Sequence, residues 1–223
     1  MASDGRKMPP QKQEAQPGKE HAMDPNPQFS NPDYKPSNKL QGMVALVTGA
    51  DSGIGRSVSL LCSGGCNCGL HLFAADLGFD ENCKRVVEEE VVKAYNRIDI
   101  LVNNAAEHYK TGSVQDIDEA RIERVFRTNI FACFFMARHG LKHMKEGSNI
   151  ICTTSVVAYK GNPNLLDYTA TKVAIVAFVR GLALELVNKG IRVNGVAPGP
   201  IWTPLIPADC LLKHLLSNKI LFS

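Results

Sequence analysis

The sequence lacks any long hydrophobic run. Its longest wholly apolar stretch, Phe131 to Ala137, has about seven residues, whereas a membrane-spanning helix needs roughly 20. The N-terminal region is polar and contains no apolar core of the kind that marks a secretory signal. These absences argue against a membrane protein and against a secreted one, so we expect a soluble protein of the cytoplasm.

The sequence also lacks a strong excess of positive or negative charge. The net charge of the 223 residues is only +3, which is too small to indicate nucleic acid or an anionic membrane as a partner. Hydrophobic residues make up 44% of the chain and charged residues 21%, as in ordinary globular proteins. A chain of this length fits one domain with one sizeable core.

The cysteines do not form a recognisable framework. There are seven, an odd number, and without a sign of secretion we expect reduced thiols. Cys62, Cys66, Cys68 and His71 are crowded enough to raise the question of zinc, but their spacing fits no common finger and a second ligand pair is missing. Ordinary packing or loop cysteines are the favoured interpretation, and we predict no metal site.

Proline is concentrated at one end. Seven of the 12 prolines lie within residues 1–38, where Gln, Lys, Asp and Asn fill most of the remaining positions. Such a segment cannot bury enough apolar surface to offset its chain entropy, so it is predicted to be disordered or to lie over the surface. The predicted organisation is a Pro/Gln-rich arm at 1–38, a domain at 39–208 and a tail at 209–223.

Short apolar runs alternate with amphipathic stretches from residue 40 onward. The runs predict strands at Met43–Val47, Leu70–Ala75, Ile98–Val102, Asn149–Ser155 and Ile191–Ala197. The amphipathic stretches predict helices at Gly53–Leu61, Asp80–Asn96, Asp118–Met144 and Leu166–Asn188. This alternation predicts an α/β fold in which a doubly wound parallel sheet, Rossmann-like, is covered by helices on both faces in three layers.

A glycine-rich turn joins the first predicted strand to the first predicted helix. Thr48 to Gly55 reads T-G-x-x-x-G-x-G. Glycines allow a sharp turn and close approach of a ligand, and the helix N-terminus presents free N–H groups to a pyrophosphate. The alternative is a bare tight turn, but the position between strand and helix favours a phosphate-binding loop.

A second group of residues has the composition of an acid–base site. Tyr168 and Lys172 are four residues apart on a predicted helix, so they share a face. A neighbouring ammonium favours the phenolate, so we expect Lys172 to lower the pKa of Tyr168. Ser155 ends the preceding strand, where ligands bind in open parallel sheets. Asn129 lies inside a predicted helix, where asparagine is unfavourable, and this suggests a functional reason.

Together these motifs resemble the short-chain dehydrogenase/reductase superfamily, and more closely its plant glucose and ribitol dehydrogenase homologues. The matching motifs, in the family's order, are Thr48-Gly49, Gly53-Ile54-Gly55, Asn103-Asn104-Ala105-Ala106, Asn129, Ser155, Tyr168, Lys172 and Pro198-Gly199. The resemblance implies an oxidoreductase that moves hydride between NAD or NADP and an alcohol, polyol, sugar or carbonyl compound.

The resemblance also implies a role for each residue. Tyr168 would be the acid–base, Lys172 would support it and hold the nicotinamide ribose, Ser155 would orient the substrate oxygen, and Asn129 would hold a water in the proton relay. The implied cofactor-binding residues are Gly49, Ser52, Gly53, Ile54, Asp76, Asn104, Ala105, Lys172, Pro198, Gly199, Ile201 and Thr203.

The chain departs from the family in two places. Only 48 positions separate Gly55 from Asn103, so roughly one strand–helix unit is absent, and Cys62 to Gly69 bridges the gap. After Ala208 the resemblance stops, and the family's final strand is missing. Two hypotheses follow: an active NAD(P)-dependent oxidoreductase, or a non-catalytic truncated paralogue or fragment that keeps the fold centre and subunit contacts.

Asp76 bears on the choice of cofactor. If Leu70–Ala75 pairs directly with the first strand, Asp76 lies beside the phosphate loop, 21 positions after Gly55. A carboxylate there would accept hydrogen bonds from a ribose 2′-hydroxyl and repel a 2′-phosphate, so we predict a weak preference for NAD. The alternative is a solvated turn aspartate before the next helix.

The family associates through the two long helices, which this chain retains. Apolar residues beyond one face of each helix are Phe131, Phe134, Phe135, Met136, Val176, Val179 and Leu182. We therefore predict a homodimer through these helices in preference to a tetramer.

Overall fold

The computed structural model describes residues 11–13, 16, 18–64 and 70–207, and within them it contains a parallel four-stranded sheet. The strands are β1 (Ala45–Val47), β2 (Ile100–Asn103), β3 (Asn149–Thr153) and β4 (Arg192–Val196), in that spatial order. All four β2 residues are buried, as expected of a central strand covered on both faces.

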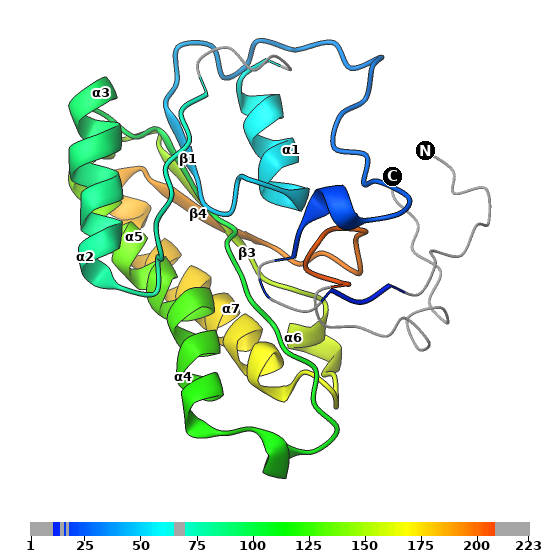
Figure 1. Ribbon diagram of the computed structural model, residues 1–223. Coiled ribbons are helices and arrows are strands. Elements are labelled where there is room, and N and C mark those ends of the chain that lie inside the picture. The colour runs from blue at the N-terminus through cyan, green and yellow to red at the C-terminus, as the bar shows by residue number, and fades with distance from the viewer. Residues whose placement is uncertain (1–10, 14–15, 17, 65–69, 208–223) are drawn as a thin grey trace.

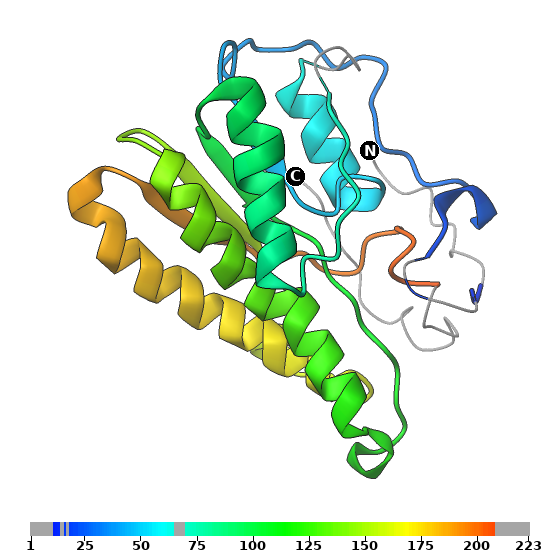
Figure 2. The same cartoon turned by 60° about the vertical axis from the view of Figure 1, so that its left-hand side comes forward.

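Helices cover the two faces of this sheet, which gives three layers (Figures 1 and 2). The α-helices are α1 (Gly53–Cys62), α2 (Asp80–Lys84), α3 (Lys93–Tyr95), α4 (Glu119–Phe126), α5 (Ala132–Gly140), α6 (Val157–Lys160) and α7 (Leu166–Leu186). The π-helical segments η2 (Arg85–Val92) and η4 (Arg127–Phe131) join α2 to α3 and α4 to α5. Short 3-10 turns are η1 (Glu20–Ala22), η3 (Val114–Asp116), η5 (Leu141–His143) and η6 (Val187–Lys189). The Rossmann-like fold, incomplete relative to the family, is thereby confirmed.

The core lies between the two central strands and the long helices. Leu101 on β2 and Ile150 on β3 are fully buried, as are Met136 on α5 and Leu186 on α7. The apolar residues at helical spacing therefore face the sheet, and their burial removes roughly 2 kcal/mol of unfavourable hydration per large side chain. This packing holds the carboxyl ends of the strands at one edge, where the candidate site lies.

The prediction of a strand at Leu70–Ala75 is wrong. The segment has no strand hydrogen bonds, and β1 pairs with β2 alone among the described residues. Leu72 is 76% exposed, so the apolar character of the run does not reflect burial between neighbouring strands. A strand forms only where a partner offers a ladder, and a β1 of three residues offers little edge on which to pair.

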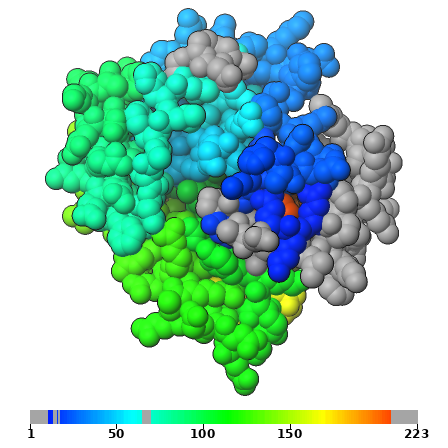
Figure 3. Space-filling model, viewed as in Figure 1, coloured from blue at the N-terminus to red at the C-terminus, as the bar shows by residue number. Residues whose placement is uncertain are grey.

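The described part of the N-terminal arm crosses the surface next to residues 201–207. Met23 is 3% exposed, and the indole Nε1 of Trp202 donates a 2.7 Å hydrogen bond to the carbonyl of Pro25. The amide N–H of Gln13 donates to the carbonyl of Pro207. Figure 3 shows the arm in dark blue beside a patch of the orange segment. The division of the chain into arm, domain and tail stays a prediction.

Two further observations concern classes of protein that the sequence argued against. No helix of the described residues is long and apolar enough to cross a membrane. In the same part of the chain, no three His, Cys, Asp or Glu side chains come together as a metal site. Cys66 and Cys68, which raised the question of zinc, lie outside the described residues.

Candidate active site

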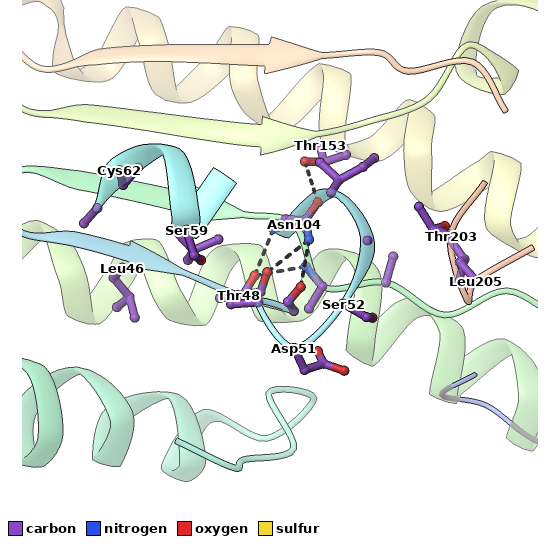
Figure 4. Close-up of a pocket in the computed structure, with 18 of the residues that line it drawn as sticks. Leu46, Thr48, Asp51, Ser52, Ser59, Cys62, Asn104, Thr153, Thr203 and Leu205 are labelled. Atoms are coloured by element: carbon purple, nitrogen blue, oxygen red, sulfur yellow. Dashed lines mark hydrogen bonds between the residues drawn. The ribbon is translucent and has the colours of Figure 1, made fainter. Parts of the chain in front are cut away.

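A cavity of about 1580 Å³ opens at the carboxyl ends of the strands (Figure 4). It extends along the outer edge of β1, which has no neighbouring strand among the described residues. Every site residue predicted from the sequence lines it, with the exception of Asn129. These residues are Gly49, Ser52, Gly53, Ile54, Asp76, Asn104, Ala105, Ser155, Tyr168, Lys172, Pro198, Gly199, Ile201 and Thr203. Segments far apart in the sequence thus meet in one hollow.

The glycines of the loop between β1 and α1 are required by close contacts. Gly49 and Gly53 have φ angles of +61° and +52°, which side chains rarely adopt. A Cβ on Gly49 would lie 2.9 Å from the Cα of Ala105, and one on Gly53 would lie 2.9 Å from the Thr203 side chain. A Cβ on Gly55 would lie 2.0 Å from the carbonyl of Gly49. The loop is therefore a bare backbone cradle at the start of α1.

Side chains from two strand ends hold this loop in place (Figure 4). The Thr48 hydroxyl oxygen accepts hydrogen bonds from the amides of Asn104 (2.8 Å) and Ala105 (3.0 Å). The Asn104 Nδ2 donates to the carbonyls of Thr48 (3.1 Å) and Gly49 (3.3 Å), and its Oδ1 accepts from the Thr153 hydroxyl (3.2 Å). The Asn104 side chain therefore connects the loop to the ends of β2 and β3 by hydrogen bonds, in addition to lining the cavity.

Tyr168, Ser155 and Lys172 are brought together as predicted. Tyr168 and Lys172 lie on α7 and Ser155 follows β3; they are 8%, 1% and 8% exposed. The Ser155 side chain interacts with the Tyr168 phenol and acts to lower its pKa. The Lys172 ammonium donates a 2.7 Å hydrogen bond to the carbonyl of Thr153 and lies 5.3 Å from the centre of the Tyr168 ring.

The electrostatics of the pair differ from the expectation. Burial raises the pKa of Tyr168 to about 12, and the hydrogen bond with Ser155 only partly opposes this shift. Burial lowers the pKa of Lys172 to about 8, against the opposing effect of the thiols of Cys133 and Cys152. The net shift of the Tyr168 pKa is therefore upward, because desolvation dominates when both groups are enclosed, and the lowering expected from Lys172 stays a prediction.

Asn129 lies behind the cavity wall, in the π-helical segment η4, and is 1% exposed. Its Oδ1 accepts a 2.8 Å hydrogen bond from the amide of Glu107, and its Nδ2 donates to the carbonyl of Glu107 (2.9 Å) and to the Thr171 hydroxyl (3.1 Å). Both amide protons are thus used by the protein. The side chain joins η4, α7 and the irregular segment after β2, and any role in a proton relay stays a prediction.

Asp76 lines the cavity but is already paired. Its Oδ2 accepts a 2.5 Å hydrogen bond from Arg124, and its Oδ1 accepts one of 3.0 Å from the amide of Gly78. Partial burial opposes ionisation of Asp76, but these hydrogen bonds outweigh it and lower its pKa. Arg124 also binds Glu107, so it bridges two carboxylates.

Sequence reasoning missed two residues at the site, Glu20 and His108. Glu20 of the arm accepts a 3.4 Å hydrogen bond from the amide of Gly53 and forms a 2.6 Å ion pair with Arg56. His108 lines the cavity beside Tyr168, with ring centres 5.1 Å apart. Neither the position of Glu20 in a polar arm nor that of His108 in an irregular stretch carries a spacing signal that would reveal these contacts.

The donor set suits a dinucleotide. The cradle of Gly49, Gly53 and Gly55 has room only for backbone, and N–H groups at a helix start favour an anionic group such as a phosphate. In this structure the carboxylate of Glu20 accepts the hydrogen bond from the Gly53 amide. Thr203 faces the same loop from the segment after β4. The cavity continues from this cradle to Tyr168, so one extended ligand could reach both.

Comparison with known proteins identifies the family. A sequence profile described as "Enoyl-(Acyl carrier protein) reductase" matches residues 42–214. The protein of Daucus carota named glucose and ribitol dehydrogenase is 63% identical over 239 aligned residues, which cover 94% of this chain and 81% of the relative. The chain belongs to the short-chain dehydrogenase/reductase family.

Two further relatives of this short-chain oxidoreductase show the breadth of the likeness. The Arabidopsis thaliana protein named NADPH-dependent aldehyde reductase 1, chloroplastic, is 60% identical, with 89% of this chain and 79% of the relative covered. The crystal structure of a 3-ketoacyl-(acyl-carrier-protein) reductase from Brucella melitensis complexed with NADH superposes with a TM-score of 0.68 at 27% identity, covering 76% of this chain and 81% of that one.

The alignment also bears on the internal shortening. The match to the Daucus carota relative spans 239 aligned positions, more than the 223 residues of this short-chain dehydrogenase/reductase. The relative therefore carries residues within the matched region that this chain lacks. This agrees with the short interval between Gly55 and Asn103, and with a sheet in which β1 has no neighbour on its outer side among the described residues.

Proposed function

We propose that this chain binds NAD or NADP and interconverts an alcohol, polyol or sugar hydroxyl with the corresponding carbonyl. The observation that carries the proposal is that Tyr168, Ser155 and Lys172 line one cavity, which is continuous with the glycine cradle. When bound, the nicotinamide supplies or accepts the hydride. The names of the relatives, a glucose and ribitol dehydrogenase and an aldehyde reductase, support this class of substrate.

The protein's own groups have separable tasks in this proposal. Tyr168 donates its phenolic proton to the substrate oxygen during reduction and removes it during oxidation. Ser155 donates a hydrogen bond to the same oxygen as charge develops there. Lys172 holds the cofactor ribose and, while protonated, stabilises the phenolate that forms when Tyr168 gives up its proton.

The protonation state of Tyr168 favours one direction. With its pKa raised to about 12, the phenol is protonated at neutral pH and is ready to act as an acid. Reduction of a carbonyl needs such an acid, whereas oxidation of an alcohol needs the phenolate. Oxidation is therefore expected to accelerate with rising pH more than reduction does.

Purified protein tests the proposal in two steps. Titration with NADH and NADPH, followed by fluorescence, measures cofactor binding; turnover is then assayed with an aldehyde, glucose and ribitol. Binding with turnover supports the proposal. Binding without turnover of any substrate, in folded protein, supports the alternative that the chain is a non-catalytic paralogue, which the missing strand–helix unit favours.

We propose further that Asp76 gives the chain a weak preference for NAD. Its ionised carboxylate faces the cavity, where it repels a 2′-phosphate. Replacing Asp76 with Ala removes that charge and frees an Arg124 nitrogen for the phosphate. We expect the ratio of NADPH to NADH affinity to rise about tenfold, equivalent to roughly 1.4 kcal/mol.

The measurement is a binding titration of both cofactors against the wild type and Asp76→Ala. Asp116→Ala, in an exposed turn that does not line the cavity, is the matched control and should leave the ratio unchanged. Equal ratios in all three proteins would exclude Asp76 from cofactor selection, despite its place at the cavity.

We also propose a homodimer through α5 and α7. Phe134 on α5 is 53% exposed and packs against Phe178 on α7, with ring centres 4.6 Å apart, so an apolar patch spans both helices. Met136 and Leu182, which the sequence assigned to this surface, belong to the core. We expect Phe134→Glu to convert dimer to monomer in light scattering. A wild-type monomer, or a Phe134→Glu dimer of unchanged stability, would contradict the interface.

A further inference from the structure

His108 occupies a position that the proposed chemistry leaves unexplained. It is 5% exposed and lines the cavity where the chain leaves β2. Its ring meets the Tyr168 ring edge to face, with centres 5.1 Å apart and planes at 77°. Its Nε2 lies 2.8 Å from the carbonyl oxygen of Leu205. One imidazole thus touches both the acid–base tyrosine and the segment that follows β4.

The contact with Leu205 determines which ring nitrogen of His108 carries the proton. A carbonyl oxygen can only accept a hydrogen bond, so Nε2 carries the proton and Nδ1 does not. Nδ1 is buried and has no partner among the described residues, so the bond to Leu205 is the one polar contact that orients the imidazole. Burial lowers the pKa of His108 to about 4, with the Leu205 hydrogen bond opposing the shift, and the ring is neutral at physiological pH.

The segment that His108 holds forms a wall of the cavity. Thr203 packs against Gly53 of the glycine cradle, and Leu205 and Ile206 line the cavity further along. In the described part of the chain, the other hydrogen bonds from residues 201–207 to the rest of the protein go to the arm, through Trp202 and Pro207. His108 therefore provides the hydrogen bond that ties this wall to the domain itself.

We propose that His108 is a positioning residue, which ties residues 201–207 to the ring of Tyr168 and so keeps the wall of the cofactor and substrate cavity at a set distance from the acid–base group. The inference rests on the proposed function for its catalytic meaning. The tie itself is a property of the folded chain and is measurable without turnover.

Two substitutions distinguish the effect of the His108–Leu205 hydrogen bond from the effect of side-chain packing at this position. His108→Gln places an amide nitrogen near the position of Nε2 and retains the donor to Leu205. His108→Asn places its amide near the position of Nδ1 and cannot reach that carbonyl. Trp202, the single tryptophan of the chain, lies in the tied segment and reports on it directly. We expect acrylamide quenching of Trp202 fluorescence to increase severalfold in His108→Asn and to stay near the wild-type value in His108→Gln.

Kinetics then test the catalytic consequence. In His108→Asn we expect KM for cofactor and substrate to rise severalfold while the pH dependence of kcat stays that of the wild type, because a neutral residue contributes no titration. His108→Gln should restore both KM values. Equal Trp202 quenching in the two variants would overturn the proposal, as would a shifted pH profile, which would indicate acid–base work by His108. If neither the wild type nor the variants turned over any substrate, the proposed function would fail. The quenching measurement would still show whether His108 holds residues 201–207 in place.

Discussion

Replacing Tyr168 with Phe should reduce kcat/KM by about 10²- to 10⁴-fold, the range over which a positioned acid–base group contributes to proton transfer. Tyr168 lines the cavity with Ser155, so removal of its phenolic oxygen leaves the substrate oxygen without a proton donor. The ring itself stays, with its edge-to-face contact to His108. Steady-state kinetics in both directions measure the effect.

The controls for this substitution are the stability of the variant and its affinity for NADH. Tyr168→Phe keeps the buried volume and removes a hydroxyl whose partner, Ser155, also accepts a hydrogen bond from the amide of Val157. We expect the melting temperature and the Kd for NADH to change little. Wild-type turnover by the Phe variant would remove Tyr168 from the chemistry, and loss of NADH binding would show that the residue acts on the cofactor instead.

Features that depend on short stretches of sequence were predictable. The run of apolar residues before Thr48, the glycines after it and the helical spacing that follows specify a strand, turn and helix almost independently of the rest of the chain. The same holds for α7, where four-residue spacing places Tyr168 and Lys172 on one face. The boundaries of β1 to β4 accordingly agree with the predicted runs to within about two residues.

The segment at Leu70–Ala75 shows why local pattern can mislead. Its composition favours a strand, but a strand needs neighbours, and these depend on residues elsewhere. The shortened interval before Asn103 removes the unit that would flank β1 in a complete family member. The run then remains irregular, with Leu72 largely exposed.

Contacts between distant residues could not be predicted from one sequence. Asp76 and Arg124 are 48 positions apart, and His108 and Leu205 are 97 apart. Nothing in the local sequence of either partner specifies the other. The same holds for burial: helical spacing places Lys172 beside Tyr168, but the burial that shifts the pKa of both side chains is produced by elements elsewhere in the chain.

Lys172 yields a prediction in which stability and activity change in opposite directions. The ammonium is fully buried, and its pKa falls from 10.5 to about 8, which corresponds to a cost on the order of 3 kcal/mol for the charged form. Methionine fills similar volume without charge, and loss of the hydrogen bond to Thr153 offsets about 1 kcal/mol of the gain. Lys172→Met should therefore be more stable at pH 7 by roughly 2 kcal/mol, yet nearly inactive.

The pH dependence of this gain separates its cause from improved packing. Below pH 8 the folded and unfolded wild-type chains both carry the proton on Lys172, so the full cost is present. Between about 8 and 10.5 the unfolded chain holds a proton that the folded chain has released, and wild-type stability rises with pH. Tyr168 titrates in both proteins, so the difference between their unfolding curves isolates Lys172. Chemical denaturation at pH 7 and pH 10 should show the advantage of Lys172→Met shrinking; an advantage that is equal at both values would mean that burial of charge is not its source.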